Sequence, residues 1–238
     1  MPTLPPTINR SVDLWTLKPQ LLNCTAFTFV AYVPTDDVQK QLPPGYEAQG
    51  FVTPIEVQVN FAVTKCGAFV INNETVIRDV TFGQTEAIVA VNESLSKGSD
   101  VQLYFLELFA SNQSVVSFLT AMGFRIGLAE FEWNGSDTTT KVVMSVAGTT
   151  WYVVEGGNGG GPEQDWAWQN RWHQELVDGR PGWINFNLTF MAPKAPAAGT
   201  LMVEAGLFKS FRPADNGAIA GGTSINEQQR AELTFGRL

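Results

Sequence analysis

The chain has 238 residues, of which 44% are hydrophobic and 16% charged, and its formal net charge at pH 7 is −8. A chain of this length can bury a sizeable core, and all-β barrels of this length commonly form one domain, so we expect a single domain over residues 1–238. The negative charge excludes a nucleic-acid binder, and the lack of an apolar run of about 20 residues excludes a membrane-spanning helix.

The first half of the chain predicts an arm, a series of strands and two short helices. Residues 1–20 hold four prolines without apolar periodicity, which is typical of an arm that lies over the domain. A short helix is expected over 38–42, and apolar residues at i, i+3, i+4 and i+7 from Val115 predict an amphipathic helix over 114–122. β-branched and aromatic runs predict strands over 26–33, 56–64, 68–71, 75–82, 85–91 and 101–109.

The second half adds further strands around a glycine-rich break. Residues 156–162 predict a flexible surface loop, and no Lys-Ser/Thr pair follows that would make it a phosphate cradle. We expect a short helical segment over 166–173 and a tail from Ala214 that is mostly loop with one further strand at most. Strands are predicted over 128–133, 138–146, 150–155, 183–190 and 199–211. The pattern indicates an all-β dominated (α+β) fold, a closed or nearly closed barrel with few short helices.

Residues 33–47, VPTDDVQKQLPPGYE, resemble the strand, short helix and turn near the start of acetoacetate decarboxylase-like proteins. Residues 83–87, 104–112 and 123–129 follow in an order that resembles the pocket-lining stretch of that family. Late in the chain, 185–190 and 202–209 resemble its closing pair of long strands. The resemblance implies a closed, antiparallel, cone-like β-barrel with a small-molecule pocket in its interior.

In the decarboxylases of this family, one lysine of a Lys-Lys pair forms a Schiff base, and its neighbour lowers the pKa of the first. The resemblance places these positions on Ile126 and Gly127, with Arg125 where the family has proline. A guanidinium does not lose its proton in proteins and cannot act as the nucleophile. We therefore expect no Schiff-base decarboxylase, and we expect Ile126 and Gly127 to line the cavity beside Glu86.

Three charged residues are candidate catalytic groups. The resemblance matches Glu86 to the pocket glutamate of the family, where an apolar interior would raise its pKa towards neutrality. Arg125 could anchor an enolate, phenolate or carboxylate, or could instead be a loop arginine bonded to backbone carbonyls. Glu107 interrupts the apolar run 103–109, where a charge is costly unless it is paired or lines a cavity.

For both glutamates the alternative is a structural ion pair with Arg125 or Arg78. Strand alternation predicts that Phe105, Glu107 and Phe109 share one face. Other side chains could form the walls of a site for an aromatic ligand, or fill the core or a subunit interface. These candidate substrate-binding residues are Tyr104, Phe105, Phe124, Ile126, Trp166, Trp168, Trp172 and His173.

The preferred function is that of a cofactor-independent enzyme on a hydrophobic, aromatic or polyketide-like small molecule. The resemblance implies a natural-product tailoring cyclase, isomerase or lyase that uses carboxylate acid–base chemistry, and it allows a homo-oligomer. With one histidine and no Cys-x-x-Cys, we expect no metal site. The alternative is a non-catalytic protein that binds a hydrophobic small molecule, in which the carboxylates only orient the ligand.

Signals for the cellular compartment disagree. Six triplets match the N-glycosylation pattern where about two are expected by chance, and they favour secretion: Asn23-Cys24-Thr25, Asn73-Glu74-Thr75, Asn92-Glu93-Ser94, Asn112-Gln113-Ser114, Asn134-Gly135-Ser136 and Asn187-Leu188-Thr189. The first residues are too polar and Pro-rich for a signal-peptide core, and two cysteines on β-rich segments are more often reduced core residues. We therefore expect the cytoplasm, with secretion and a Cys24–Cys66 pair as the alternative.

Overall fold

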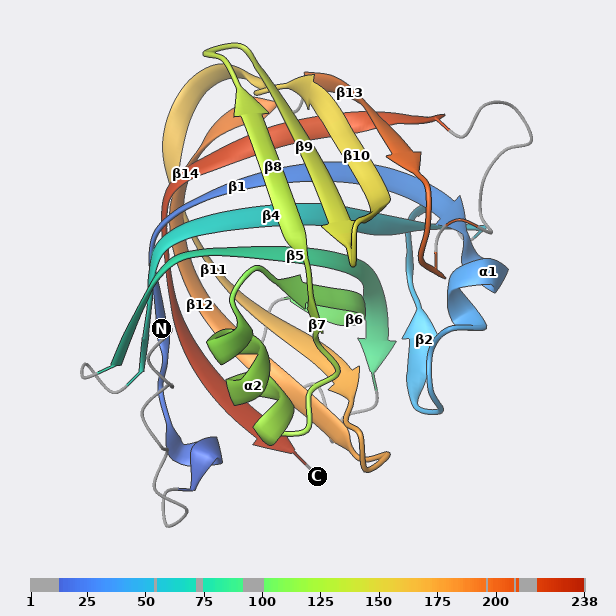
Figure 1. Ribbon diagram of the computed structural model, residues 1–238. Coiled ribbons are helices and arrows are strands. Elements are labelled where there is room, and N and C mark those ends of the chain that lie inside the picture. Colours follow the sequence, from blue (N-terminus) through green and yellow to red (C-terminus); the bar gives the residue numbers. More distant parts are fainter. Residues whose placement is uncertain are drawn as a thin grey trace.

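The computed structural model describes residues 13–53, 55–71, 75–91, 101–195, 197–207, 209 and 218–237. Most of these residues lie in strands of one large sheet, and two short α-helices, α1 and α2, accompany it (Figure 1). The elements are η1 (Leu14–Thr16), β1 (Gln20–Pro34), α1 (Thr35–Gln39), β2 (Tyr46–Ala48), β3 (Gly50–Thr53), β4 (Glu56–Ile71), β5 (Thr75–Val91), β6 (Val101–Ala110), α2 (Gln113–Ala121), β7 (Gly127–Leu128), β8 (Glu130–Gly135), β9 (Thr139–Val146), β10 (Thr149–Gly157), β11 (Gly160–Glu175), β12 (Pro181–Ala195), β13 (Ala197–Val203) and β14 (Ala218–Arg237).

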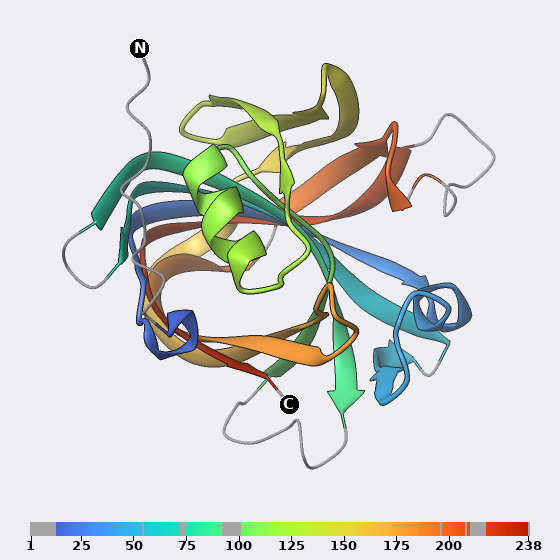
Figure 2. The ribbon, with the colours of Figure 1, turned by 60° about the horizontal axis from the view of Figure 1, so that its bottom comes forward.

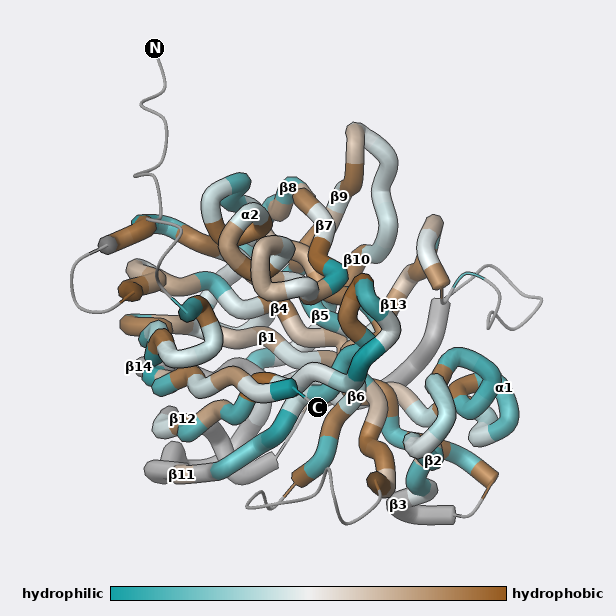
Figure 3. The backbone as a smooth tube through the Cα atoms, turned by 90° about the horizontal axis from the view of Figure 1, so that it is seen from below, coloured by the Kyte–Doolittle hydropathy of each residue, from teal (hydrophilic) through white to brown (hydrophobic). Residues whose placement is uncertain are grey.

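Seven strands pair in a closed circuit, which we call the ring. The order is β1, β4, β5, β6, β11, β12 and β14, and β14 pairs with β1 again. All neighbours in the ring are antiparallel except β6 and β11, which run parallel. Hydrophobic and hydrophilic residues alternate along these strands, as expected where one face lies in a core (Figure 3).

The inside of the ring is an apolar core to which all seven strands contribute. Phe69, Leu103 and Phe235 are examples of its buried members, and α2 lies over one end of the ring (Figure 2). The helix contributes Val115 and Phe118 to this core, the side chains on the stripe that its sequence predicted. We call this cluster the interior core.

The outer faces of β1, β4 and β5 are covered by a second layer. From β14 the sheet continues through β13, β10, β9 and β8, and these strands fold over the ring. Phe29, Val59 and Phe61 pack there against Met144 and Val154. This second cluster is the outer core, so β1, β4 and β5 contribute buried side chains to both cores.

Three sequence-based expectations about elements are wrong. Residues 166–173 belong to the long strand β11, and the glycine run is mostly strand, because β10 ends at Gly157 and β11 begins at Gly160. The tail holds β14, a strand of 20 residues. In β14 the buried Ala231, Leu233 and Phe235 alternate with more exposed residues, a two-residue period that indicates a strand. Of the expected arm, residues 1–12 lie outside the described part of the chain.

The two cysteines form a disulfide, contrary to the expectation that they are reduced. Cys24 and Cys66 are direct partners on β1 and β4, and both are buried in the interior core. Adjacent strands bring the two side chains together, which sequence separation alone does not show. Among the described residues, neither helix is long and apolar enough to cross a membrane.

We expect the Cys24→Ala, Cys66→Ala double variant to lower the free energy of unfolding by about 4 kcal/mol. The bond spans 42 residues, and a loop of that length restricts the unfolded chain by about this amount. Urea denaturation of the variant and of the oxidised and reduced wild type measures the loss. Equal stability of oxidised and reduced wild type would contradict a structural disulfide.

Candidate functional site

A recess of about 250 Å³ opens at the rim of the ring, where β6 and β11 meet the link between α2 and β7. Its walls mix aromatic and aliphatic side chains with two carboxylates, two amides and a guanidinium. The lining residues are Gln41, Tyr104, Phe105, Leu106, Glu107, Arg125, Gln174, Glu175 and Leu207. Four of the predicted site residues, Tyr104, Phe105, Glu107 and Arg125, therefore come together here.

A β-bulge in β6 decides which way the residues of this strand point. Thr85 pairs with Glu107, whereas the next residue of β5, Glu86, pairs with Phe105, so Leu106 has no partner on β5. The extra residue interrupts the alternation of side chains. Phe105 therefore lies in the interior core while Phe109 lies in the outer core, which corrects the prediction that they share one face with Glu107.

Glu107 lies on the outer-core side of the bulge, under the segment that follows β13. Its Oε1 accepts a hydrogen bond from the backbone N–H of Leu207 at 2.8 Å, and Oε2 accepts one from the Thr85 hydroxyl at 3.5 Å. Gly206 has φ of +82°, and a Cβ there would lie 2.7 Å from Oε1. The backbone can thus approach the carboxylate closely only because residue 206 is glycine.

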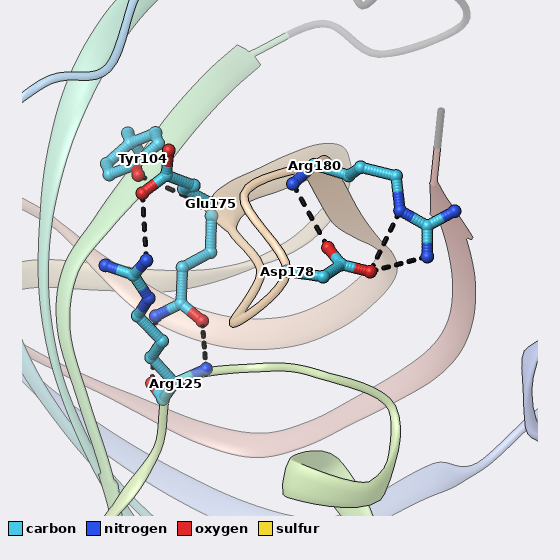
Figure 4. Close-up of polar contacts among 6 residues, drawn as sticks. Tyr104, Arg125, Glu175, Asp178 and Arg180 are labelled. Atoms are coloured by element: carbon cyan, nitrogen blue, oxygen red, sulfur yellow. Dashed lines mark hydrogen bonds and ion pairs between the residues drawn. The ribbon is translucent and has the colours of Figure 1, made fainter.

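Arg125 is fixed at the recess by its backbone and its side chain (Figure 4). Its N–H donates to Gln174 Oε1 at 2.6 Å, and its carbonyl accepts from Gln174 Nε2 at 2.9 Å. The guanidinium forms an ion pair with Glu175 at 2.9 Å and keeps 56% of its side chain exposed. Tyr104 accepts a hydrogen bond from the Glu175 N–H at 3.0 Å. These contacts tie the α2–β7 link to the end of β11.

Glu86 lies on the other side of the bulge, inside the ring and only 5% exposed. Asn60 Nδ2 donates to Oε1 at 3.1 Å, Gln84 Nε2 donates to Oε2 at 3.2 Å, and the indole N–H of Trp172 also donates to Oε2. Trp172 stacks on Phe105, with ring centroids 6.0 Å apart. Phe105 thus links the recess to the surroundings of Glu86.

Neither glutamate forms an ion pair within the described part of the chain, so the predicted alternative of a pair with Arg125 or Arg78 is wrong. Arg125 pairs with Glu175 instead, and Arg78 is exposed. Burial raises the pKa of Glu86 to about 7, and the hydrogen bonds from Trp172 and Asn60 offset only part of that rise. Burial also raises the pKa of Glu107, opposed by the hydrogen bond from Leu207. Both can exchange protons nearer neutrality than an exposed glutamate.

His173 lies outside the ring and away from the recess. It is fully buried, its Nε2 is 2.7 Å from Gln102 Oε1, and its Nδ1 is 3.4 Å from the Tyr46 hydroxyl. Gln102 Oε1 can only accept, so Nε2 carries the proton and Tyr46 donates to Nδ1. Burial lowers the pKa of His173 to about 3, and nearby Arg171 adds to this. The imidazole of His173 therefore stays neutral and links β2, β6 and β11.

The remaining predicted residues lie in the cores or outside the described side chains. Phe124 is buried in the interior core, and Ile126 packs against the same core. Gly127 lies against the ring of Phe109 in the outer core. Neither Ile126 nor Gly127 lines the recess. The side chains of Trp166 and Trp168 lie outside the described part of the structure.

Five residues of the recess were not predicted: Gln41, Leu106, Gln174, Glu175 and Leu207. Gln174 and Glu175 end β11, and the two-residue spacing of Trp168, Asn170 and Trp172 could have indicated that strand. Leu207 reaches the recess through a contact 100 residues away in sequence, for which the sequence holds no local signal.

The described part of the structure offers no buried lysine and no cluster of metal ligands. Lys18, Lys40, Lys65 and Lys209 are exposed, and Lys141 pairs with Glu155 at 3.1 Å on the surface. No described lysine side chain is buried. Among the described residues, no three His, Cys, Asp or Glu side chains cluster so that they could hold a metal ion.

Comparison with known proteins supports the fold. No family model and no curated protein sequence matches the chain. Several solved structures do match. Acetoacetate decarboxylase from Legionella pneumophila is 16% identical with a TM-score of 0.61, and the match covers 92% of this chain and 86% of the decarboxylase. The enduracididine biosynthesis enzyme MppR complexed with pyruvate is 11% identical with a TM-score of 0.60, and the match covers 93% of this chain and 89% of MppR. An acetoacetate decarboxylase-like enzyme from Sphingomonas wittichii RW1 is 8% identical with a TM-score of 0.61, and the match covers 95% of this chain and 94% of that enzyme. The predicted acetoacetate decarboxylase-like fold is confirmed.

We expect Glu86→Gln to change how stability depends on pH. Because the folded-state pKa of Glu86, about 7, lies above its ordinary value of 4.5, its contribution is fully present below pH 4.5 and is lost as pH rises through 7. The wild type should therefore lose about 3 kcal/mol relative to the variant between pH 4 and pH 8. Urea denaturation of both proteins across this range measures the difference, and parallel curves would contradict the raised pKa.

Proposed function

We propose that this chain, which has the acetoacetate decarboxylase-like fold, is a cofactor-independent enzyme that moves protons on a hydrophobic small molecule. The substrate binds in the recess at the rim of the ring. Glu107 acts as the general base or acid, and Arg125 stabilises the oxyanion that forms when a proton leaves the carbon next to a carbonyl.

The observation that carries this proposal is a partly buried carboxylate with a raised pKa and no cation partner among the described residues, on the wall of a recess that also holds a guanidinium. A buried carboxylate without a cation is costly unless it is hydrogen-bonded or lines a cavity, and Glu107 combines two hydrogen bonds with a place on the wall of the recess. A pKa nearer neutrality suits a group that takes a proton and returns it. Arg125 is exposed enough to reach a ligand although Glu175 already binds it.

The walls of the recess support an aromatic or polyketide-like substrate. Tyr104, Phe105, Leu106 and Leu207 provide flat and apolar surfaces, and Gln41 and Gln174 provide amides for the polar edge of a ligand. Held against these walls, such a substrate could undergo cyclisation, isomerisation or a lyase reaction with proton transfer at Glu107. Among proteins of this fold, MppR has been solved with the condensation product of pyruvate and imidazole 4-carboxaldehyde, which supports a role in natural-product tailoring.

Glu86 is the second carboxylate to consider, and it provides a matched control. Both glutamates have a raised pKa and no cation partner among the described residues, but only Glu107 lines the recess. A Gln substitution at either position removes the charge at nearly constant volume. The two variants therefore separate proton transfer in the recess from the general effect of altering a buried glutamate.

We expect the protein to accelerate exchange of deuterium into the α-carbon of a small aryl ketone such as acetophenone in D₂O, followed by NMR. Glu107→Gln should slow this exchange by about 10²-fold per folded molecule, the usual scale for a positioned proton-transfer group. Glu86→Gln should keep the rate within about threefold, because its side chain does not touch the ligand.

The reverse ranking of the two variants would move the reacting centre into the ring interior. Saturable binding of the ketone, with no exchange above that of Glu107→Gln, would support a binding protein instead of an enzyme.

We expect borohydride reduction in the presence of acetoacetate or pyruvate to leave the mass of the protein unchanged. No described lysine side chain is buried, and Schiff-base formation requires a lysine amine that is activated by apolar surroundings or by a neighbouring cation. Intact-mass spectrometry gives the result, and an acetoacetate decarboxylase treated in parallel is the positive control. A stoichiometric adduct would contradict lysine-free chemistry.

A further inference from the structure

The asparagines of the chain follow a pattern that the proposed enzyme does not explain. Of 14 asparagines, seven stand two residues before Ser or Thr with no intervening proline, where about two are expected by chance. The seventh triplet, Asn9-Arg10-Ser11, joins the six given above and lies outside the described residues. We call such an asparagine an acceptor asparagine.

The structure separates acceptor asparagines from the others. Asn23, Asn134 and Asn187 are exposed, and within the described part of the chain their side-chain amides make no hydrogen bond. A fourth acceptor, Asn112, is half-buried and caps α2 by accepting from the Ser114 N–H at 2.9 Å. Three of the four described acceptors thus present a free amide to solvent.

Most asparagines outside acceptor triplets whose side chains are described form hydrogen bonds within the fold instead. Asn60 donates to Glu86, and Asn158 donates to the Ser136 carbonyl at 3.1 Å. Asn185 accepts from Arg171 Nε at 2.6 Å, and Asn170 is buried. Of the asparagines whose side chains are described, one of four acceptors is hydrogen-bonded, compared with three of four outside the triplets.

The three free acceptors lie where a large group can be attached. Asn134 is near the end of the β8–β9 hairpin, followed by exposed Gly135 and Ser136, and Figure 1 shows this hairpin at the edge of the molecule. Asn187 is in β12, between Gln169 of β11 and Glu232 of β14. Asn23 has φ of +53° at a bulge in β1. None of them lines the recess, so groups attached there leave it open.

The disulfide is an independent observation that points to the same compartment. Cys24–Cys66 lies in the interior core, and disulfides form and persist in oxidising compartments such as the lumen of the endoplasmic reticulum. N-linked glycans are attached to Asn-x-Ser/Thr triplets of secreted proteins. Exposed acceptor triplets and a core disulfide are both typical of proteins that mature in the secretory pathway.

We propose that Asn23, Asn134 and Asn187 are N-glycosylated and that the chain matures in the secretory pathway. The side-chain nitrogen of each asparagine displaces the diphosphate of a lipid-linked oligosaccharide, forming the bond to the first sugar carbon as the sugar–phosphate bond breaks. The amide loses one proton in this step, and no redox change occurs. This proposal concerns a modification of the outer surface and is independent of the proposed enzyme activity.

The first experiment uses the protein purified from the organism that makes it. Peptide N-glycosidase in 18O-water converts each glycosylated asparagine to 18O-labelled aspartate, which peptide mass spectrometry locates. We expect the label at Asn23, Asn134 and Asn187 and none at Asn158 or Asn185, and no alkylation of Cys24 or Cys66 before reduction. Unlabelled Asn134 and Asn187, or free thiols at both cysteines, would overturn the proposal.

A second experiment tests Asn134 with matched variants of the full chain, secreted from yeast behind a leader sequence. Asn134→Gln and Ser136→Ala should each lose the mass of one glycan, whereas Ser136→Thr should keep it because a hydroxyl remains at the third position. All variants should retain the wild-type Tm after enzymatic deglycosylation, since the Asn134 amide makes no hydrogen bond within the described structure. The same mass for wild type and Asn134→Gln would overturn the assignment of this site.

Discussion

The structure depends on the pairing of β14 with three other strands. This strand hydrogen-bonds to β1 and β12, which closes the ring, and to β13, which carries the chain into the outer layer. Its buried side chains, Leu233 among them, complete the interior core. Without it, β1 and β12 would each present an open edge, and the interior core would lose a wall.

The bulge at Leu106 places the carboxylates of two neighbouring strands, β5 and β6, in two different environments. Glu86 faces three hydrogen-bond donors inside the ring, and Glu107 faces a backbone N–H and a hydroxyl under Gly206. In each case neutral donors replace the cation that usually accompanies a buried carboxylate. Such an arrangement leaves both protonation states within reach, whereas an ion pair would fix the charge.

Patterns within one element were readable from the sequence, and contacts between distant elements were not. The spacing of Val115 and Phe118 predicted α2, and the family resemblance predicted the fold. Aromatic content around Trp172 concealed the two-residue period of β11, so the residues at its end were missed. The face of Glu107 depends on how β5 and β6 pair at the bulge, and the Cys24–Cys66 bond depends on the register of β1 and β4.

The pairing of the first long strand with the last sets the order of events during biosynthesis. Since β1 begins at Gln20 and its partner β14 ends at Arg237, the ring cannot close until nearly the whole chain has left the ribosome. Until then β1 offers an unpaired edge on which a neighbouring nascent chain can add a strand. A chaperone that shields this edge until β14 is made would protect the yield of folded protein.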